Sequence, residues 1–202
     1  MLTRLSSAGS VGSAIAHCTT VKLRLLSALW LVLSVGPLRS ATLEQLSLDE
    51  MAVKSTAIVR GKVTGAYAAF SGRMIYTHYT VQVSERFKGA GESTVDVAAP
   101  GGVANGLRQT FEGAPVFHTG EEYVFFLWRG ETGPTQVVGL TQGLFAIDPG
   151  GSRDPAVTRA ASRETMLAAG TGRPVKDQTL VMPLSQLRGR IAAALAAGSG
   201  AK

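Results

Sequence analysis

Between residues 56 and 148 the chain repeats short runs in which apolar and polar residues alternate, and no long helical pattern separates them. Thr56–Val63 and Ile75–Val83 alternate most clearly, whereas Tyr123–Trp128 is apolar on both faces, as in a strand at the centre of a fold. Parallel strands need long crossover connections, usually helices, so a parallel sheet is disfavoured. The pattern predicts a mainly β fold of five to six antiparallel strands, arranged as a small barrel or a sandwich.

A short helix is predicted just before the first strand. Ser47 and Glu50 form the S-x-x-E pattern of a capping box, and Leu46 and Met51 have the spacing of a hydrophobic staple. These four positions predict a helix from Leu48 to about Lys54.

The C-terminal part divides into two segments. Residues 149–182 are rich in Gly, Arg, Pro, Ser and Thr and show little periodicity, which favours a linker or an extended wrap along the β domain. Residues 183–198 predict a helix, because four aliphatic residues recur at helical spacing and Gly198 is a plausible stop. The apolar stripe, which we expect to dock on the β domain, consists of Leu184, Leu187, Ile191 and Leu195.

The first 41 residues have the pattern of a signal peptide. Lys22 and Arg24 precede the apolar run Leu25–Leu38, which is too short to span a bilayer comfortably, and small residues suitable for cleavage follow. A buried core helix is the alternative interpretation of this run. Val21 is a possible true start of translation, because the twenty residues before it are unusual for a leader. We therefore predict a secreted or periplasmic protein with no membrane span after processing.

Charge and cysteine content exclude several classes of function. The chain has a net charge of +6, but four basic residues lie in the leader, which leaves 16 basic against 14 acidic residues from position 41 onward. Such a balanced domain lacks the basic surface of a nucleic-acid binder. The single cysteine, Cys18, also lies in the leader, so the exported part has neither a disulfide nor a thiolate.

Catalytic and metal-binding patterns are scarce in the exported part. It holds only His78 and His118, too few for a histidine-based metal site, and each is expected to be solvated or hydrogen-bonded. Glu121 and Glu122 are neighbours on an extended strand, so their side chains are expected to point to opposite faces and not to share a substrate atom. We predict no cofactor, no metal and no enzymatic activity, although a catalytic site assembled from distant residues stays open.

The glycine-rich stretch GGVANGLR, residues 101–108, invites comparison with a phosphate-binding loop. Gly101 and Gly106 have the separation of the P-loop glycines, but Leu107 and Arg108 occupy the places of its Lys and Ser/Thr. No amphipathic helix follows, so the loop lacks the helix N-terminus that would bind an anion. The glycines are therefore predicted to permit tight turns with positive φ between strands.

A hairpin between the first two strands supplies the candidate binding residues. Tyr67 and Phe70 lie near its expected tip beside Arg73, and His78 points outward on the following strand. Tyr, Phe and Arg are residue types common in binding hot spots. The alternative is that the two aromatic side chains fold back and cap the end of a barrel.

The order of four motifs resembles the netrin-like domain, the secreted OB-type barrel also found in tissue inhibitors of metalloproteinases. The motifs are STAIVRGKVTGAY, YTVQVSERFKG, PGG and GEEYVFFLW, within about residues 55–148. The resemblance implies a small antiparallel OB-like barrel over residues 42–148. The inhibitors present an N-terminal cysteine to the protease metal, and this chain has none in its exported part, so that mechanism does not carry over. The chain also resembles secreted bacterial proteins with a PGG…GEEYVFFL pattern.

These observations predict an exported, non-enzymatic binding module. Its partner is expected to be a protein or an extracellular polymer, held by the loops at one end of the barrel and by Tyr67, Phe70, Arg73 and His78. Two alternatives stay open: an inhibitor or chaperone of a co-secreted protease, implied by the resemblance, and a hydrolase with an unrecognised site around His78 or His118.

Overall fold

The computed structural model describes residues 42–199, and the predicted leader, its cleavage site and the possible start at Val21 lie outside them. The described part is mainly β, with two helices. The helices are α2 (Leu48–Lys54) and α3 (Leu184–Ser199). The strands are β1 (Thr42–Gln45), β2 (Ala57–Ser71), β3 (Met74–Lys88), β4 (Thr94–Pro100), β5 (Gly102–Ala104), β6 (Leu107–Gln109), β7 (Glu122–Arg129), β8 (Thr135–Val137), β9 (Leu144–Ile147), β10 (Ala156–Arg159), β11 (Thr165–Ala168), β12 (Pro174–Val175) and β13 (Leu180–Pro183). In residues 42–199 neither helix is long and apolar enough to cross a membrane.

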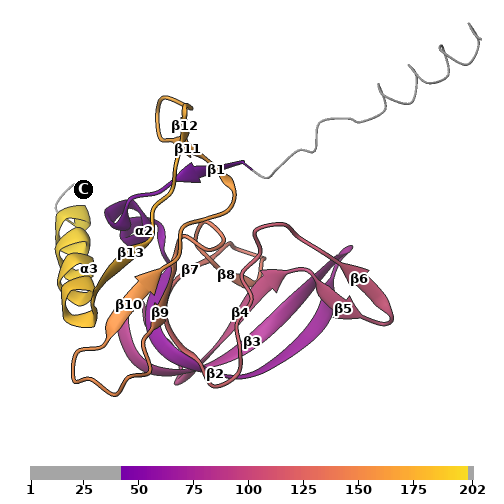
Figure 1. Ribbon diagram of the computed structural model, residues 1–202. Helices are drawn as coiled ribbons and strands as arrows, with labels where there is room; N and C mark the ends of the chain where they lie inside the picture. Colours follow the sequence, from indigo (N-terminus) through magenta and orange to yellow (C-terminus); the bar gives the residue numbers. More distant parts are fainter. Residues whose placement is uncertain (1–41, 200–202) are drawn as a thin grey trace, which may run out of the picture. The chain divides into compact units, whose positions relative to one another are not determined.

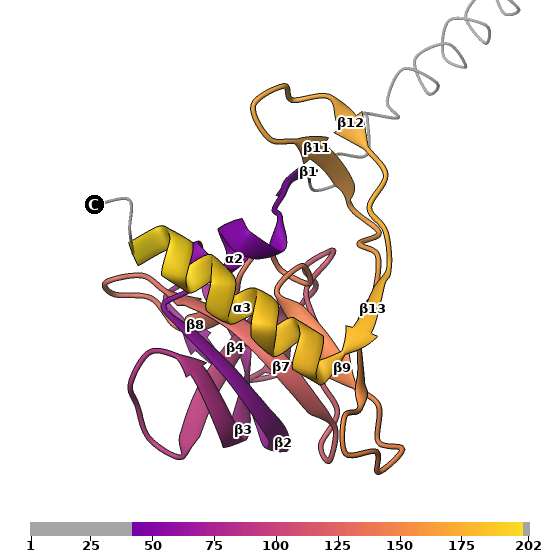
Figure 2. The same ribbon diagram turned by 90° about the vertical axis from the view of Figure 1, so that its left-hand side faces the viewer.

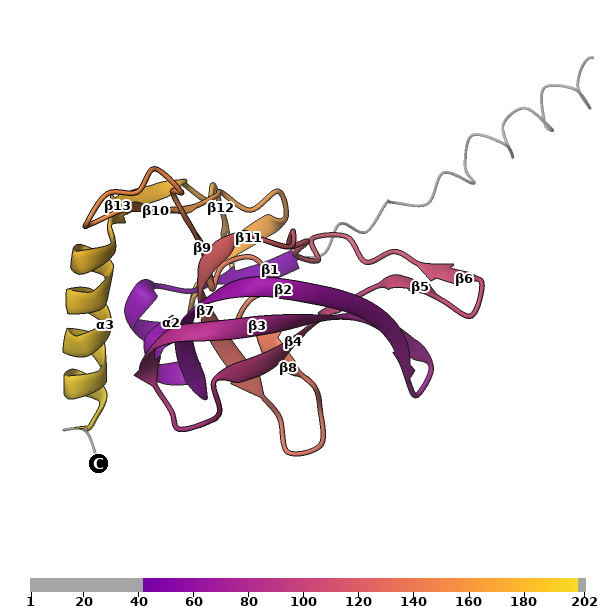
Figure 3. The same cartoon turned by 90° about the horizontal axis from the view of Figure 1, so that it is seen from below.

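The main sheet is antiparallel and follows the order β13-β10-β9-β7-β2-β3-β4, with β8 also paired to β7 (Figure 1). Strands β2 and β3 form a long hairpin whose register shifts at three places in its first half. Such bulges bend a strand pair and increase its twist, in keeping with the curved hairpin in Figure 3.

The sheet buries both of its faces around β7, as the apolar pattern predicts. Val124 and Phe126 point into a core shared with the two helices, β9 and β10. Phe125 and Leu127 point the other way, into a second core between β2, β3, β4 and β8. Tyr123 through Leu127 are all buried, whereas Trp128, at the end of the predicted run, is exposed.

The predicted closed barrel is a point that the structure corrects. Among residues 42–199 the strand pairing is an open path that ends at β13 on one side and β4 on the other. The sheet does curl, because Val97 of β4 and Val137 of β8 pack in the same core, but these two strands form no ladder. One edge of β7 pairs with β2 and the other with β8 and β9, so the sheet continues to β10 and β13 instead of returning to β4.

The segment 149–182, expected as a linker or extended wrap, carries four short strands. β10 and β13 extend the main sheet, while β11 and β12 form a separate three-stranded sheet with β1, which runs parallel to β11. These strands have two to four residues each. Runs of that length are too short to show the periodicity by which a strand is recognised in a sequence.

The two helices pack side by side against the first core, as Figure 2 shows. Both hydrogen bonds of the capping box are present at α2: Ser47 Oγ accepts from the Glu50 N–H at 3.2 Å, and Glu50 Oε2 accepts from the Ser47 N–H at 2.8 Å. In α3 the predicted apolar stripe faces the core, with Leu187 and Ile191 fully buried.

Candidate binding surface

The outer half of the β2–β3 hairpin projects beyond the rest of the sheet. β7 pairs with β2 only as far as Lys62, so from Gly65 to Ser71 no strand covers the free edge of β2. Strand β4 supports the other side of this ribbon, opposite Tyr76 to Gln82. All four candidate residues, Tyr67, Phe70, Arg73 and His78, lie on this projecting part (Figures 1 and 3).

Tyr67 and His78 face each other directly across the two strands. Their rings are stacked, with centroids 4.9 Å apart and planes 9° apart. Tyr76 meets the same imidazole edge-on at 6.5 Å. The side chains of facing residues and of residues two apart share one face of a sheet. Tyr67, Tyr76 and His78 therefore lie on one face.

Asp96 of β4 completes this group, which we call the outer-face array (Tyr67, Tyr76, His78 and Asp96). Its Oδ2 lies 2.7 Å from Nδ1 of His78. His78 is therefore hydrogen-bonded, as predicted. The Tyr67 side chain, by contrast, remains 55% exposed, so it does not fold back to cap a barrel end.

Phe70 and Arg73 do not belong to the outer-face array. Phe70 is three residues beyond Tyr67 on a strand without further register shifts, so it points to the opposite face. Arg73 lies in the turn and its side chain is exposed. The structure thus places Tyr67 and His78 on one face of the hairpin, Phe70 on the other and Arg73 in the turn, a separation that was not predicted.

Phe70 instead faces the hairpin formed by β5 and β6. The turn of this second hairpin is Asn105-Gly106, with φ values of 50° and 75°, and Gly101 and Gly102 also have positive φ. The prediction that the glycines of residues 101–108 permit tight turns is confirmed. The Asn-Gly pair was a signal for a hairpin in its own right, since both residues accept the positive φ of a tight two-residue loop.

Close contacts hold the two hairpins together. The Ile75 N–H donates to Gln109 Oε1 at 2.6 Å, and Gln109 Nε2 donates to the Arg73 carbonyl at 3.2 Å. Thr77 Oγ1 donates to the Gly101 carbonyl at 2.9 Å. A Cβ at Gly102 would lie 2.5 Å from Thr77 Oγ1. Only glycine therefore fits where β5 packs against β3 without moving the neighbouring atoms.

Four exposed apolar side chains lie on the two hairpins or just after β6, and we call them the apolar tip. Each of them is between 40% and 61% exposed. They come from β2, β5, β6 and the second residue after β6: Phe70, Val103, Leu107 and Phe111. Of these four, only Phe70 was predicted to be a binding residue, because the others are scattered single residues in or near a glycine-rich segment.

The remaining chemical candidates have structural partners. Glu122 pairs with Arg60 at 2.8 Å, and the Tyr123 hydroxyl donates to Glu121. The two carboxylates thus have different partners, although both residues line the same cavity. His118 is exposed in the loop before β7. Within the described part of the chain, no group of three or more His, Cys, Asp or Glu side chains is arranged to hold a metal ion.

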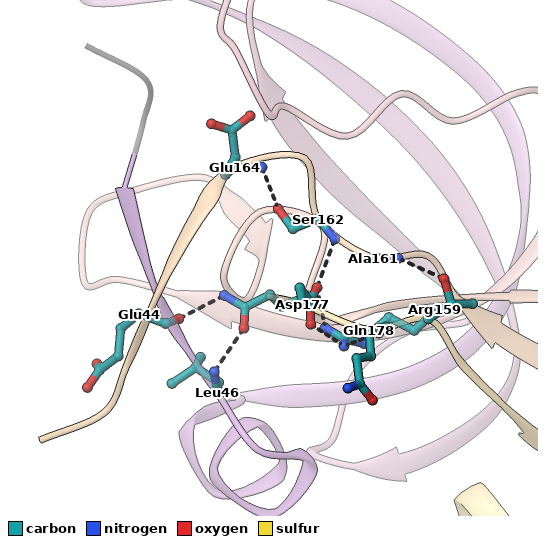
Figure 4. Close-up of polar contacts among 10 residues, drawn as sticks. Glu44, Leu46, Arg159, Ala161, Ser162, Glu164, Asp177 and Gln178 are labelled. Carbon is teal, nitrogen blue, oxygen red and sulfur yellow. Dashed lines mark hydrogen bonds and ion pairs between the residues drawn. The ribbon is translucent and has the colours of Figure 1, made fainter. Parts of the chain in front are cut away.

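Arg159 and Asp177 form a buried ion pair, whose polar contacts Figure 4 shows, and both residues line a cavity of about 640 Å³. Arg159 Nη2 is 2.7 Å from Asp177 Oδ1, and the two side chains are only 5% and 1% exposed. Asp177 Oδ2 also accepts from the Ser162 N–H at 2.8 Å, and Arg159 donates to the Gln178 carbonyl. Asp177 Oδ2 also accepts a hydrogen bond from Arg159 Nη1 at 3.2 Å. The ion pair therefore joins β10 to the segment before β13.

Comparison with known proteins adds no further assignment: no family model, no characterised protein and no solved structure matches the chain. The netrin-like resemblance, and the inhibitor or chaperone role that it implies, therefore stay predictions.

Proposed function

We propose that this chain is an exported, non-enzymatic binding module that engages an extracellular polymer through the outer-face array. The observation that carries the proposal is the half-exposed Tyr67 ring, stacked on an imidazole that is itself held by Asp96. The leader pattern supports a secreted or periplasmic location.

The surroundings of Tyr67 leave one face of its ring open to a ligand. One face lies against His78, while the other faces the edge of β2 where β7 has already ended. Because the ring is braced across two paired strands, a ligand would gain contact area without first ordering a flexible side chain.

The chemistry of the array suits a chain of sugar rings. Tyr67 and Tyr76 each combine an apolar ring with a hydroxyl, and Asp96 adds a half-exposed carboxylate. A sugar ring presents the complementary combination, an apolar face of C–H groups and a rim of hydroxyls. A protein partner is the competing possibility, since Tyr is also common in hot spots between proteins.

The test is co-sedimentation of the purified exported protein with insoluble polymers, namely peptidoglycan sacculi, chitin and cellulose. We expect Tyr67→Ala to weaken retention on the bound polymer by about tenfold, because stacking on one aromatic ring is worth roughly 0.5–1.5 kcal/mol and its amphipathic contact area adds to this. Trp128→Ala is the matched control, since it removes an exposed aromatic ring from another part of the sheet.

Three outcomes count against the proposal. If the wild-type protein sediments with none of the polymers, polymer binding is rejected. It is also rejected if Tyr67→Ala and Trp128→Ala are retained equally while circular dichroism shows that both are folded. Capture of one secreted protein by wild type but not by Tyr67→Ala supports the protein alternative instead.

The His78–Asp96 contact makes a hydrolase the second candidate. A carboxylate on Nδ1 would hold a proton there and leave Nε2 as a base. If this is correct, His78→Gln abolishes hydrolysis of a panel of ester and peptide substrates. No hydrolysis by the wild-type protein rejects this candidate.

A further inference from the structure

Phe70 lies on the face of the β2–β3 hairpin opposite Tyr67, and the apolar tip to which it belongs is not explained by polymer binding. We propose that the apolar tip docks onto the surface of an anionic lipid bilayer. Its four side chains are 40% (Phe70), 49% (Val103), 61% (Leu107) and 46% (Phe111) exposed. They are four of the nine large apolar or aromatic side chains that are exposed in residues 42–199.

Two arginines flank these apolar side chains. Arg73 lies in the turn after Phe70, and Arg108 follows Leu107 on β6. Both are exposed, and neither forms an ion pair with another described residue. Glu112, the acidic residue next to Phe111, lines a cavity of about 600 Å³ together with Glu164. Apolar side chains beside unpaired cations are the combination that binds at an anionic headgroup layer.

The form of the tip favours a bilayer over a protein partner. A stable protein interface buries about 800 Å² and some 20–30 residues on each side, with close shape complementarity. The tip offers only four side chains, which lie on two hairpins or just after β6. Figure 3 shows the two hairpins projecting from the sheet. A bilayer surface adapts to such projections and requires no complementary pocket.

The hydrogen bonds of Gln109 allow the two hairpins to act as one unit. Since Gln109 joins β6 to both Arg73 and Ile75, the spacing between the Phe70 and Leu107 segments is set before any contact is made. Docking therefore requires little further ordering of the backbone. Because Phe70 and Tyr67 lie on opposite faces, a docked protein would keep the outer-face array free for polymer.

Vesicle co-sedimentation tests the proposal on the purified exported protein. Vesicles contain either phosphatidylcholine alone or equal parts of phosphatidylcholine and phosphatidylglycerol. We expect binding to the anionic vesicles that falls with added salt. The double variant Leu107→Ser/Phe111→Ser should bind at least about tenfold more weakly, because two partly exposed apolar side chains can no longer be buried.

Two further variants separate the contributions. Arg73→Gln/Arg108→Gln should lose most of the preference for anionic vesicles, at about fivefold per arginine. Val181→Ser is the matched control, because Val181 is 64% exposed on β13, at the other edge of the sheet. It should bind vesicles as the wild type does.

The proposal is overturned if the wild-type protein stays in the supernatant with anionic vesicles, or if the tip variant and the Val181 control bind equally. A wild-type dimer that the tip variant converts to a monomer would assign the tip to self-association instead. Failure of vesicle binding can be distinguished from failure of polymer binding. The tip variants should still sediment with polymer, and Tyr67→Ala should still bind vesicles.

Discussion

Gln109 and Ile75, which lie 34 residues apart, are joined by a 2.6 Å hydrogen bond from the Ile75 amide to the Gln109 side chain. The same side chain also donates to the Arg73 carbonyl, at the turn of the long hairpin. The Gln109 side chain thus bonds to backbone groups at the end of the β2–β3 hairpin, as the backbone of a paired strand would. These bonds help to set the distance between the two hairpins. The apolar tip depends on this link.

Gln109→Ala should loosen the tip more than it destabilises the whole fold. Loss of the two hydrogen bonds is expected to cost about 1–2 kcal/mol, and amide hydrogen exchange at Ile75 should accelerate by at least about tenfold. Gln136→Ala on β8 is the control and should leave exchange at Ile75 unchanged. Equal exchange in the Gln109 variant and the wild type would show that the hairpins are held by their other contacts, such as the hydrogen bond from Thr77 to Gly101.

Lys88 should be important for α2. Its ammonium group donates to the Ala52 and Val53 carbonyls at 2.8 and 2.9 Å, at the C-terminal end of the helix. Burial lowers the pKa of Lys88 from its usual value. Lys88→Met keeps the apolar stem and removes the donors, so urea denaturation should show a loss of about 1–2 kcal/mol. Lys54→Met, in the last turn of the same helix, should cost clearly less; a larger loss there would contradict the assignment to Lys88.

The Arg159–Asp177 pair should be far more costly to break than to replace. Asp177→Ala leaves a buried guanidinium without its carboxylate, and we expect a loss of about 3–5 kcal/mol in the free energy of unfolding. The double variant Arg159→Met/Asp177→Leu, which removes both charges, should recover most of that loss. Guanidinium chloride denaturation of the three proteins gives the comparison. A double variant as unstable as Asp177→Ala would mean that the hydrogen bonds to Ser162 and Gln178 matter more than the charges.

The Arg60–Glu122 pair should make stability depend on pH in the acid range. The hydrogen bond from Arg60 is the main reason that the pKa of Glu122 lies below its usual value. A lowered pKa stabilises the folded state at pH values above the pKa of the unfolded chain, and the effect disappears as pH falls through the pKa of the folded state. Glu122→Gln should therefore be less stable by about 0.5–1 kcal/mol at neutral pH and equal to the wild type well below about pH 4.

Thermal unfolding at several pH values measures this difference. Glu131→Gln, in the exposed loop after β7, is the matched control and should follow the wild type throughout. A difference between Glu122→Gln and the wild type that stays constant down to acid pH would show that the pair does not titrate as described.

Local signals in the sequence were sufficient for several elements. The capping box at Ser47 and Glu50 acts within one helical turn, and the apolar stripe of α3 recurs at four positions with helical spacing, so both are visible without tertiary information. The alternation of Ile75–Val83 indicates a strand with one buried face, and the continuous apolar run of β7 indicates a strand buried on both faces. Both patterns can likewise be recognised from the sequence. The positive φ at Gly106 follows from chain chemistry alone.

Tertiary structure alone decided how these elements combine. The open sheet with β10 and β13, the Arg159–Asp177 pair and the contact between His78 and Asp96 all depend on which segments pair and in what register. Register joins residues far apart in the chain, and a shift of one residue exchanges the two faces of a strand. Alternation along a single strand specifies which residues share a face, but the partners they meet there are chosen only when the strands pair.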